Sequence, residues 1–397
     1  MNRENNSIRW IYLVIGTFAL LFAGIIYAWS ILKAPLADEF GWTASALSLN
    51  FTITMCCFCI GGIVGGTLMK KVGFRIDCIA GAVLSAVGFI GTSMTGNSIA
   101  ILYVSYGVLS GFGIGIAYNA IISTVNAWFP DKKGLCSGVL MMGFGASALI
   151  LGSIADALIG NPAIGWRSTY RILGILLGLV LLAAALVIKR PAEEAPRAQA
   201  TSQDSSNDYT LAQMLRSIKF WKAFVCVVFL AAVGNTVISM AKDLAVSIGV
   251  SLSMATTLVG VLSVCNGLGR IMTGAAFDRF GRRATMIGAN IGAICASGIT
   301  LLAIVSGSVL LCVVGLCLTG ISYGTCPTIS SAYISEVFGS KYFSTNFSVM
   351  NCNLLVASFI ATGTSLITAA TGSYAGAFIL LLALTLIAMV LNLSLKK

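Results

Sequence analysis

Long apolar runs, separated by short polar loops that we call joints, fill most of the chain. Residues 11–32 and 172–188 are two examples of such runs. A run of about 18 or more residues with few charges is long enough to cross a bilayer as a helix. Twelve such segments are predicted, at about 10–32, 44–68, 76–95, 98–127, 134–157, 167–189, 220–241, 254–276, 283–305, 308–335, 343–368 and 372–394. The pattern therefore predicts an all-α membrane protein with twelve transmembrane helices.

One stretch near the middle of the chain breaks this pattern. Residues 190–219 read RPAEEAPRAQATSQDSSNDYTLAQMLRSIK and are rich in Pro, Ala, Ser and charge. Such a composition is typical of a solvated linker. We therefore expect three parts, namely six helices in 1–189, a linker in 190–219 and six helices in 220–397.

The composition excludes a soluble globular protein. Of the 397 residues, 58% are apolar and only 9% are charged, whereas soluble domains carry about 25% charged residues. The net charge of +11 comes from Lys and Arg in alternate short joints rather than from one basic face, so no nucleic acid is expected as a partner. Because basic joints lie on the cytoplasmic side, both termini and the linker are predicted to be cytoplasmic, in a multi-pass protein of the inner membrane.

Two joints repeat at a fixed interval. The joint after the second span reads GTLMKKVGFR from Gly66 to Arg75, and the joint after the eighth reads GAAFDRFGRR from Gly274 to Arg283, 208 residues later. Spans four and ten also match, at a separation of 209 residues. An internal repeat is typical of transporters that hold their solute near the midplane between two halves.

Both joints resemble the cytoplasmic loop motif of the major facilitator superfamily. The resemblance implies a glycine that lets two helices approach closely, and an Asp that binds the N-terminal end of a neighbouring helix and nearby Arg side chains, which holds one conformation. The first copy has Lys70 in place of that Asp. The candidate residues of this loop motif are Gly66, Lys71, Gly73 and Arg75 in the first copy, and Gly274, Asp278, Arg279, Gly281, Arg282 and Arg283 in the second.

A finer resemblance covers nearly the whole chain. The segments that carry it are YAWS from Tyr27, GFGIGIAY up to Tyr118, WFPDKKG from Trp128, NGLGR from Asn266 to Arg270, and the Asn-Phe pair at Asn346. They are similar to the oxalate:formate antiporter and monocarboxylate transporter branch, which implies exchange or uptake of small carboxylates. That branch places binding aromatic residues in spans one, four and ten. Here these would be Tyr27, Tyr118 and Tyr323, although Tyr323 is matched by its span alone and ordinary packing is the alternative.

Arg270 points to an anion independently of the resemblance. It is read as the only charge deep in a span, about 9 Å from the cytoplasmic end of span eight by helix rise. Insertion scales put the cost of such a charge at about 2.5 kcal/mol or more, so it is a functional candidate by default. Guanidinium binds carboxylate through two parallel hydrogen bonds. The alternative is an Arg whose head group reaches the cytoplasmic interface.

Two departures from the branch narrow the prediction. The oxalate antiporters pair the span-eight Arg with a Lys in span eleven, where this chain offers only neutral side chains such as Asn353. The animal monocarboxylate:proton symporters carry an Asp four residues before the Arg, where this chain has Asn266. We therefore expect a monocarboxylate such as formate, lactate or pyruvate, moved by exchange rather than strict proton symport. The first alternative is an oxalate/formate-type dicarboxylate antiporter, and a less favoured one is a drug or neutral-solute exporter.

Other chemistry is not indicated. The chain has 12 Cys, most of them in apolar segments, and no His. Small buried thiols are common core residues, and no set of metal ligands is suggested. No phosphate-binding loop or nucleophile–base pair is evident, so neither a cofactor nor an enzymatic activity is expected. The predicted partners are the carboxylate and membrane lipid, and the protein is expected to be monomeric.

Overall fold

The computed structural model describes residues 3–191 and 208–395. These residues divide into two compact units. Of the described residues, unit 1 comprises 3–131, 139–191, 208 and 340–349, and unit 2 comprises 132–138, 209–339 and 350–395. The units therefore do not follow the sequence repeat strictly, because each takes in one short segment from the other repeat.

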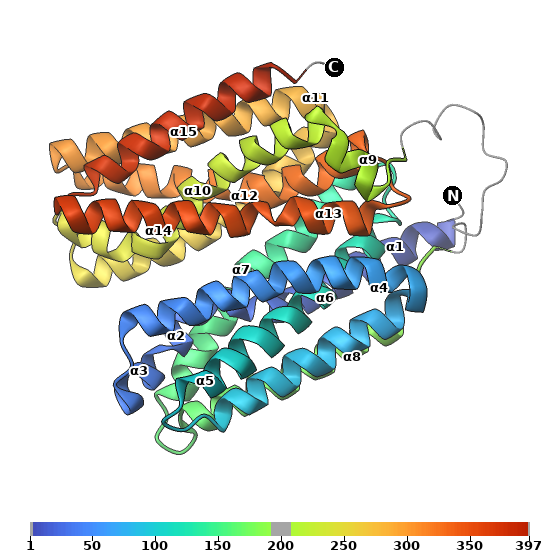
Figure 1. The fold of residues 1–397 in the computed structure, drawn as a ribbon, viewed down its shortest axis with the longest axis horizontal. Helices are drawn as coiled ribbons and strands as arrows, with labels where there is room; N and C mark the ends of the chain where they lie inside the picture. The colour runs from blue at the N-terminus through green and yellow to red at the C-terminus, as the bar shows by residue number, and fades with distance from the viewer. Residues whose placement is uncertain (1–2, 192–207, 396–397) are drawn as a thin grey trace. The chain divides into compact units, whose positions relative to one another are not determined.

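The described parts contain helices and short connections (Figure 1). The elements before residue 192 are α1 (Arg3–Ala23), η1 (Gly24–Ala28), α2 (Trp29–Leu32), α3 (Ala34–Phe40), α4 (Ala44–Ser93), α5 (Ile99–Leu102), η2 (Tyr103–Ser110), α6 (Gly111–Asn126), α7 (Lys133–Ile159) and α8 (Gly165–Val187). Those after residue 207 are α9 (Leu211–Arg216), α10 (Ile218–Ser247), α11 (Leu252–Ser306), α12 (Val309–Val337), α13 (Phe343–Asn351), α14 (Asn353–Thr371) and α15 (Ala375–Leu393).

Ten helices within the described residues are long and apolar enough to cross a membrane. Two of them, α4 and α11, contain apolar stretches of 44 and 50 residues, and one crossing takes about 20 residues. Each bends at a glycine, Gly73 (φ 80°, ψ 167°) in α4 and Gly281 (φ 78°, ψ 171°) in α11. Figure 1 shows α4 doubling back at its bend. Counting two crossings in each bent helix brings the total to the twelve predicted.

Several predicted spans are less regular than the hydropathy pattern suggests. The first continues from α1 into the 3-10 segment η1, the fourth contains the π-helical segment η2, and the eleventh is divided at Cys352 between α13 and α14. The end of the predicted linker is helical, because Thr210 and Gln213 form a reciprocal capping box that starts α9. Residues 192–207 of the linker lie outside the described residues.

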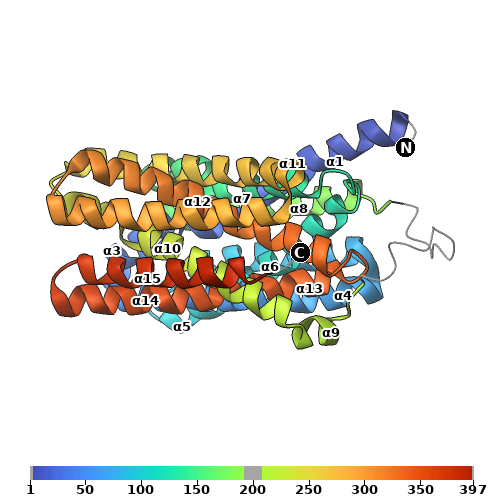
Figure 2. The same cartoon turned by 90° about the horizontal axis from the view of Figure 1, so that it is seen from above.

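Glycines bring the main helices of each unit into close contact. In unit 1, a Cβ atom at Gly115 of α6 would lie 2.1 Å from the Phe58 carbonyl oxygen of α4. In unit 2, a Cβ atom at Gly324 of α12 would lie 2.2 Å from the Asn266 carbonyl oxygen of α11, and the views agree that α11 and α12 run side by side (Figure 2). Small residues allow this approach where no hydrophobic effect drives helices together.

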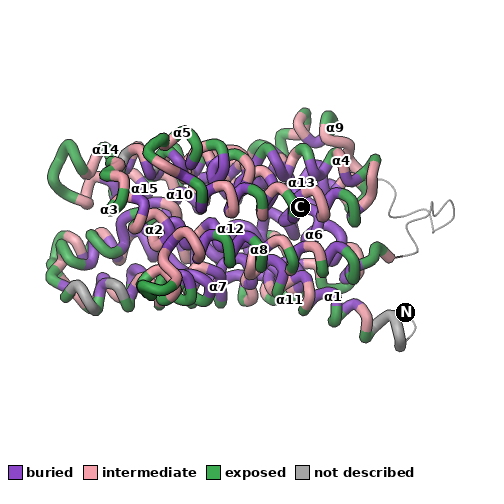
Figure 3. Tube along the Cα trace, turned by 90° about the horizontal axis from the view of Figure 1, so that it is seen from below, coloured by how far each residue is buried: buried purple, intermediate pink, exposed green. Residues whose placement is uncertain are grey.

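Buried and exposed turns alternate along the helices (Figure 3). Many exposed side chains are large and apolar, such as Val305 at 74% and Leu310 at 73% exposed. Such a surface suits lipid rather than water. It therefore fits the composition, which could not cover a water-facing surface with polar residues.

Candidate functional site

Arg270 is buried inside unit 2. It lies on α11 and is 2% exposed. Its Nε atom donates to Oδ1 of Asn266 over 3.2 Å, one helical turn earlier. A head group that reached an aqueous interface would be exposed, so this burial does not match the alternative interpretation of Arg270. The sequence spacing thus places a guanidinium and an amide together on one helix face, as i, i+4 neighbours.

The backbone around Arg270 is tightly packed by two other segments. The Thr328 hydroxyl of α12 donates to the Arg270 carbonyl oxygen over 3.3 Å. At Gly138, near the start of α7, a Cβ atom would lie 2.5 Å from the same oxygen. At Gly324 a Cβ atom would lie 2.9 Å from the Arg270 backbone nitrogen. The turn that carries the guanidinium is therefore held in place by backbone contacts.

Tyr323 belongs to a polar chain that sequence reasoning missed in part. Its hydroxyl donates to Oδ1 of Asn235 on α10 over 2.8 Å. The Asn235 amide in turn donates to the Ser358 hydroxyl of α14 over 3.2 Å. Three helices of unit 2 thus share one hydrogen-bonded path. The signal for Asn235 was a lone amide inside the apolar run AAVGNTVISM.

Asn353 begins α14 and is 1% exposed. Its amide donates to the Met350 carbonyl oxygen over 2.5 Å and to the Ser330 hydroxyl over 3.4 Å. Both partners are neutral. Asn353 is therefore a neutral, hydrogen-bonded amide within span eleven.

Tyr27 and Tyr118 come together in unit 1. Both rings pack against Phe144 of α7, with ring centroids 5.1 and 4.9 Å away. Tyr118 also packs against Phe58, at 5.1 Å. The two predicted tyrosines therefore belong to one aromatic cluster, to which Phe58 and Phe144 add rings that the sequence did not single out. Tyr118 is 4% exposed, whereas Tyr27 is partly exposed.

The second copy of the loop motif caps a helix. Asp278 accepts hydrogen bonds from two backbone amides in the first turn of α7, from Gly134 to Oδ1 over 2.9 Å and from Leu135 to Oδ2 over 2.8 Å. A carboxylate at a helix N-terminus is favoured by the helix dipole and by the unpaired amides there. These two bonds correspond to the helix-terminus part of the role that the resemblance implies for Asp278. Arg282 lies beside a different carboxylate, with Nε 3.9 Å from Oε1 of Glu336.

The first copy has the same backbone arrangement with different chemistry. A Cβ atom at Gly66 would lie 2.8 Å from the Ser344 carbonyl oxygen at the start of α13, and one at Gly274 would lie 2.3 Å from the Gly134 carbonyl oxygen at the start of α7. Lys70 places its Nζ atom 4.6 Å from the centroid of the Tyr342 ring. The remaining cations of the motif, Lys71, Arg75, Arg279 and Arg283, are exposed.

The structure shows a second buried ionisable side chain. Asp77 of α4 is 0% exposed. Asp77 lies inside the predicted span 76–95, close to the basic joint that precedes it. Among the described residues, no group of three or more His, Cys, Asp or Glu side chains gathers as a metal site would.

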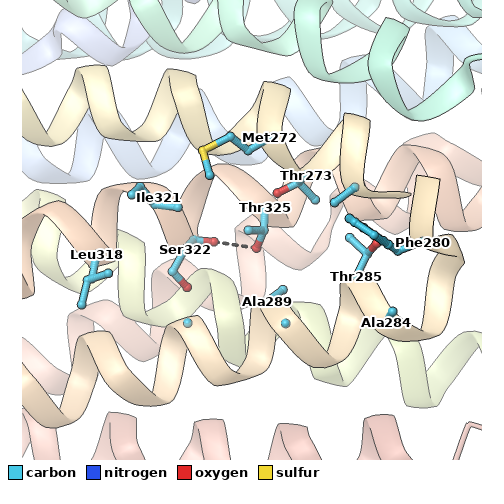
Figure 4. Close-up of a pocket in the computed structure, with 13 residues that line it drawn as sticks. Met272, Thr273, Phe280, Ala284, Thr285, Ala289, Leu318, Ile321, Ser322 and Thr325 are labelled. Atoms are coloured by element: carbon cyan, nitrogen blue, oxygen red, sulfur yellow. Dashed lines mark hydrogen bonds between the residues drawn. The ribbon is translucent and has the colours of Figure 1, made fainter. Parts of the chain in front are cut away.

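A cavity of about 280 Å³ lies along α11 and α12 in unit 2 (Figure 4). Its walls include Thr273, Ser322 and Thr325, and its rim includes Met272 and Phe280, which are 58% and 64% exposed. None of its lining residues is charged. It offers no cation to bind an anion, and its apolar rim is suited to lipid contact.

These features define a class of protein. Within the described residues, ten long apolar helices, two of them bent at glycines of a repeated loop motif, are the architecture of a multi-pass membrane protein. The chain belongs to the Major Facilitator Superfamily, because the sequence model of that family matches residues 13–240 and 223–396.

Individual relatives refine this assignment. The chain is 28% identical over 279 residues to the oxalate:formate antiporter of Oxalobacter formigenes, which covers 70% of this chain and 65% of that protein. It is 26% identical over 266 residues to monocarboxylate transporter 12 of Xenopus laevis, covering 62% of this chain and 56% of that protein. The aligned parts thus span less than two thirds of either relative.

A solved structure shows the same fold. A variant of the E. coli fucose:proton symporter FucP matches 97% of this chain and 98% of its own, with a TM-score of 0.73 and 17% sequence identity. At this identity the likeness concerns the fold alone. The prediction of an all-helical major facilitator fold is confirmed.

Proposed function

We propose that this protein is a secondary transporter that moves small carboxylates across the inner membrane by alternating access. The observation that carries the proposal is the buried Arg270–Asn266 pair, with Arg270 2% exposed and Nε bound to a neutral amide oxygen. A guanidinium carries five N–H donors in a planar fork that matches a carboxylate. A cation held in a membrane span is costly, so it is kept where it serves a function.

The aromatic cluster of unit 1 supports an organic substrate. Tyr27 and Tyr118 combine an apolar ring with a hydroxyl that can bind an oxygen atom. Rings of this kind can pack against a short carbon skeleton, and their hydroxyls can bind a carboxylate oxygen. The names of both relatives contain a small carboxylate as substrate, which agrees with this chemistry.

A monocarboxylate such as formate, lactate or pyruvate is favoured over a dicarboxylate. A second carboxylate would need a second cation, and Asn353 offers a neutral amide already bonded to Met350 and Ser330. Asn266 likewise supplies no proton site next to Arg270. Exchange of one monocarboxylate for another therefore suits this chain better than strict proton symport at that position. The alternative is a dicarboxylate antiporter, which is supported by the name of the Oxalobacter relative.

Counterflow in proteoliposomes tests this proposal. Vesicles loaded with unlabelled formate, lactate, pyruvate or oxalate would be offered each labelled acid, with a neutral sugar and a cationic dye as controls. We expect accumulation of labelled monocarboxylates without an imposed pH gradient and little accumulation of oxalate. Transport of the dye or sugar in place of every acid would refute the carboxylate assignment, and preference for oxalate would select the antiporter alternative.

The proposed orientation has its own test. The basic joints place both termini on the cytoplasmic side. In a cysteine-free background, a cysteine at Ser217 should be protected from an impermeant thiol reagent in intact cells, and a cysteine at Gly96 should react. Reversal of this labelling would invert the topology.

A further inference from the structure

Asp77 is a buried carboxylate that the proposed transport site does not use. It lies on α4, four residues after the bend at Gly73, within the apolar stretch Leu49–Thr92. It is 0% exposed. Neither Oδ1 nor Oδ2 has a hydrogen-bond partner among the described residues. Its neighbours Arg75 and Ile76 are exposed, so the burial is specific to the face that carries Asp77.

Two helices pack against this part of α4. Cys78, the next residue, places its Sγ atom 3.7 Å from the Leu181 carbonyl oxygen of α8. One turn further on, a Cβ atom at Gly81 would lie 2.7 Å from the Gly113 carbonyl oxygen of α6 and 3.0 Å from the Ala117 side chain. Asp77 therefore lies at a three-helix junction formed by α4, α6 and α8.

The charged groups of these helices do not neutralise Asp77. Helix α6 contains no Asp, Glu, Lys or Arg, and its titratable Tyr118 packs against Phe58 and Phe144. The cations of α8 are Arg167 and Arg171, and Arg171 lies ten residues from Leu181, or about 15 Å along the helix. On α4 itself, Lys71 and Arg75 are exposed, Lys70 lies over the Tyr342 ring, and Cys78 is the nearest titratable neighbour.

An ionised carboxylate without a cation or a hydrogen-bond donor is costly in a low-dielectric interior, and the neutral acid is far less so. Both carboxylate oxygens of Asp77 are free to bind a cation. A proton is small enough to bind there without any movement of the packed helices. We propose that Asp77 is a proton-binding site of this transporter, and that its carboxyl group holds a proton in the folded conformation. The proton comes from water, and it is released when the carboxyl group becomes accessible to water.

A protonated Asp77 makes the stability of the fold depend on pH, and this dependence does not involve the Arg270–Asn266 pair. The unfolded chain exposes Asp77 to water, where an aspartate loses its proton near pH 4. A carboxyl group that must be neutral in the fold supports folding fully at low pH, and its contribution is lost as pH rises above that value. The sign is opposite to that of an ordinary salt-bridged Asp, which supports folding at high pH.

The test compares the thermal unfolding of purified wild type, Asp77→Asn and Asp156→Asn between about pH 5 and pH 9. Asn keeps the shape of the protonated acid but cannot ionise. Asp156 is an exposed carboxylate on α7 and serves as the matched control. Relative to both other proteins, Asp77→Asn should lose less stability with rising pH and should melt about 2–4 °C higher at the alkaline end.

An Asp77→Asn protein that melts below wild type at every pH, or that keeps the wild-type pH dependence, would overturn the proposal. A second measurement covers the case in which this variant does not fold. Infrared spectroscopy of the wild type at neutral pH should show the C=O stretching band of a protonated carboxylic acid, which Asp77→Asn should lack and Asp156→Asn should keep. Absence of that band from the wild type would also overturn the proposal. Neither readout depends on the identity of the transported solute.

Discussion

The two bent helices, α4 and α11, are copies of one design that carry different chemistry. Their bends have nearly the same backbone angles, at Gly73 (φ 80°) and Gly281 (φ 78°). Each packs closely on the span that follows it, α4 on α6 and α11 on α12. Where α11 has Asp278, however, α4 has Lys70, and the counterpart of Arg270, 208 residues earlier, is Gly62.

This difference distinguishes the residues that the helix architecture requires from the residues that we assign to substrate binding. Bends and close helix contacts depend on glycine, since no side chain fits or adopts the required backbone angles. They are therefore present in both copies. In the proposed function the buried cation of α11 binds the substrate, and one such cation suffices for a monocarboxylate. We accordingly expect the recognition of charge to depend on α11, and the variants below test that asymmetry.

The largest effect is expected at Arg270. Loss of a hydrogen-bonded charge partner costs about 2–5 kcal/mol of binding free energy, or roughly 30-fold or more in affinity. Arg270→Ala should therefore abolish measurable binding. Arg270→Lys keeps the charge but loses the planar fork, so it should also bind poorly. Substrate affinity in detergent, measured beside the melting temperature, checks both variants.

Arg279→Lys is the matched control, because Arg279 is an exposed cation of the same helix. It should bind substrate normally. Near-normal affinity in both Arg270 variants would remove Arg270 from the binding site and, with it, the main support for an anionic substrate.

The next effect is expected at Asp278. Asp278→Ala removes two charge-assisted hydrogen bonds to the start of α7, and bonds of this kind contribute about 1.5–3 kcal/mol. Because Asp278 is exposed, solvent screening should hold the total loss to about 2 kcal/mol. The melting temperature of the purified protein measures this loss. Lys70→Ala, the same change in the other copy, should cost less, and equal losses would show that the two copies do not differ in this respect.

The bends should respond alike in both copies. Gly73→Ala and Gly281→Ala each place a Cβ atom in open space. The cost is therefore that of a backbone conformation with positive φ and extended ψ, which is nearly restricted to glycine and costs other residues about 1–3 kcal/mol. Gly288→Ala, in a regular part of α11 that is also open, should be neutral or stabilising. If melting temperatures show a loss at only one bend, the shared-architecture interpretation fails.

The parts that could be predicted from the sequence are those set by local pattern. The hydropathy pattern predicted the helices. The four-residue spacing of Asn266 and Arg270 puts both side chains on one face of α11. The contact of Asp278 with a helix N-terminus was implied by the resemblance to the loop motif, and the helix dipole explains why a carboxylate suits that position.

The parts that could not be predicted depend on packing between distant segments. Asp77 adjoins a basic joint, and only the contacts of α4 with α6 and α8 show that it is buried. Tyr323 and Asn235 are 88 residues apart in the sequence. The assignment of Lys132–Gly138 and Ser340–Val349 to the opposite units likewise has no local signal, because the unit boundaries after Gly138 and after Val349 lie inside the helices α7 and α13.

The smallest effect is expected when the first copy is converted to the chemistry of the second. Lys70→Asp would place a carboxylate near the start of α13, where the helix dipole favours it by about 0.3–1 kcal/mol. The same change removes the contact of Lys70 with the Tyr342 ring, and an exposed cation–π contact contributes about 0.5–1 kcal/mol. In the wild-type background these terms should nearly cancel.

In a Tyr342→Leu background the ring is absent, so Lys70→Asp should raise the melting temperature. Lys71→Asp, at an exposed neighbour, is the control and should have little effect in either background. A Lys70→Asp change that destabilises the Tyr342→Leu protein would show that the start of α13 does not accept a carboxylate, and that the two copies differ in backbone geometry and not only in side chain.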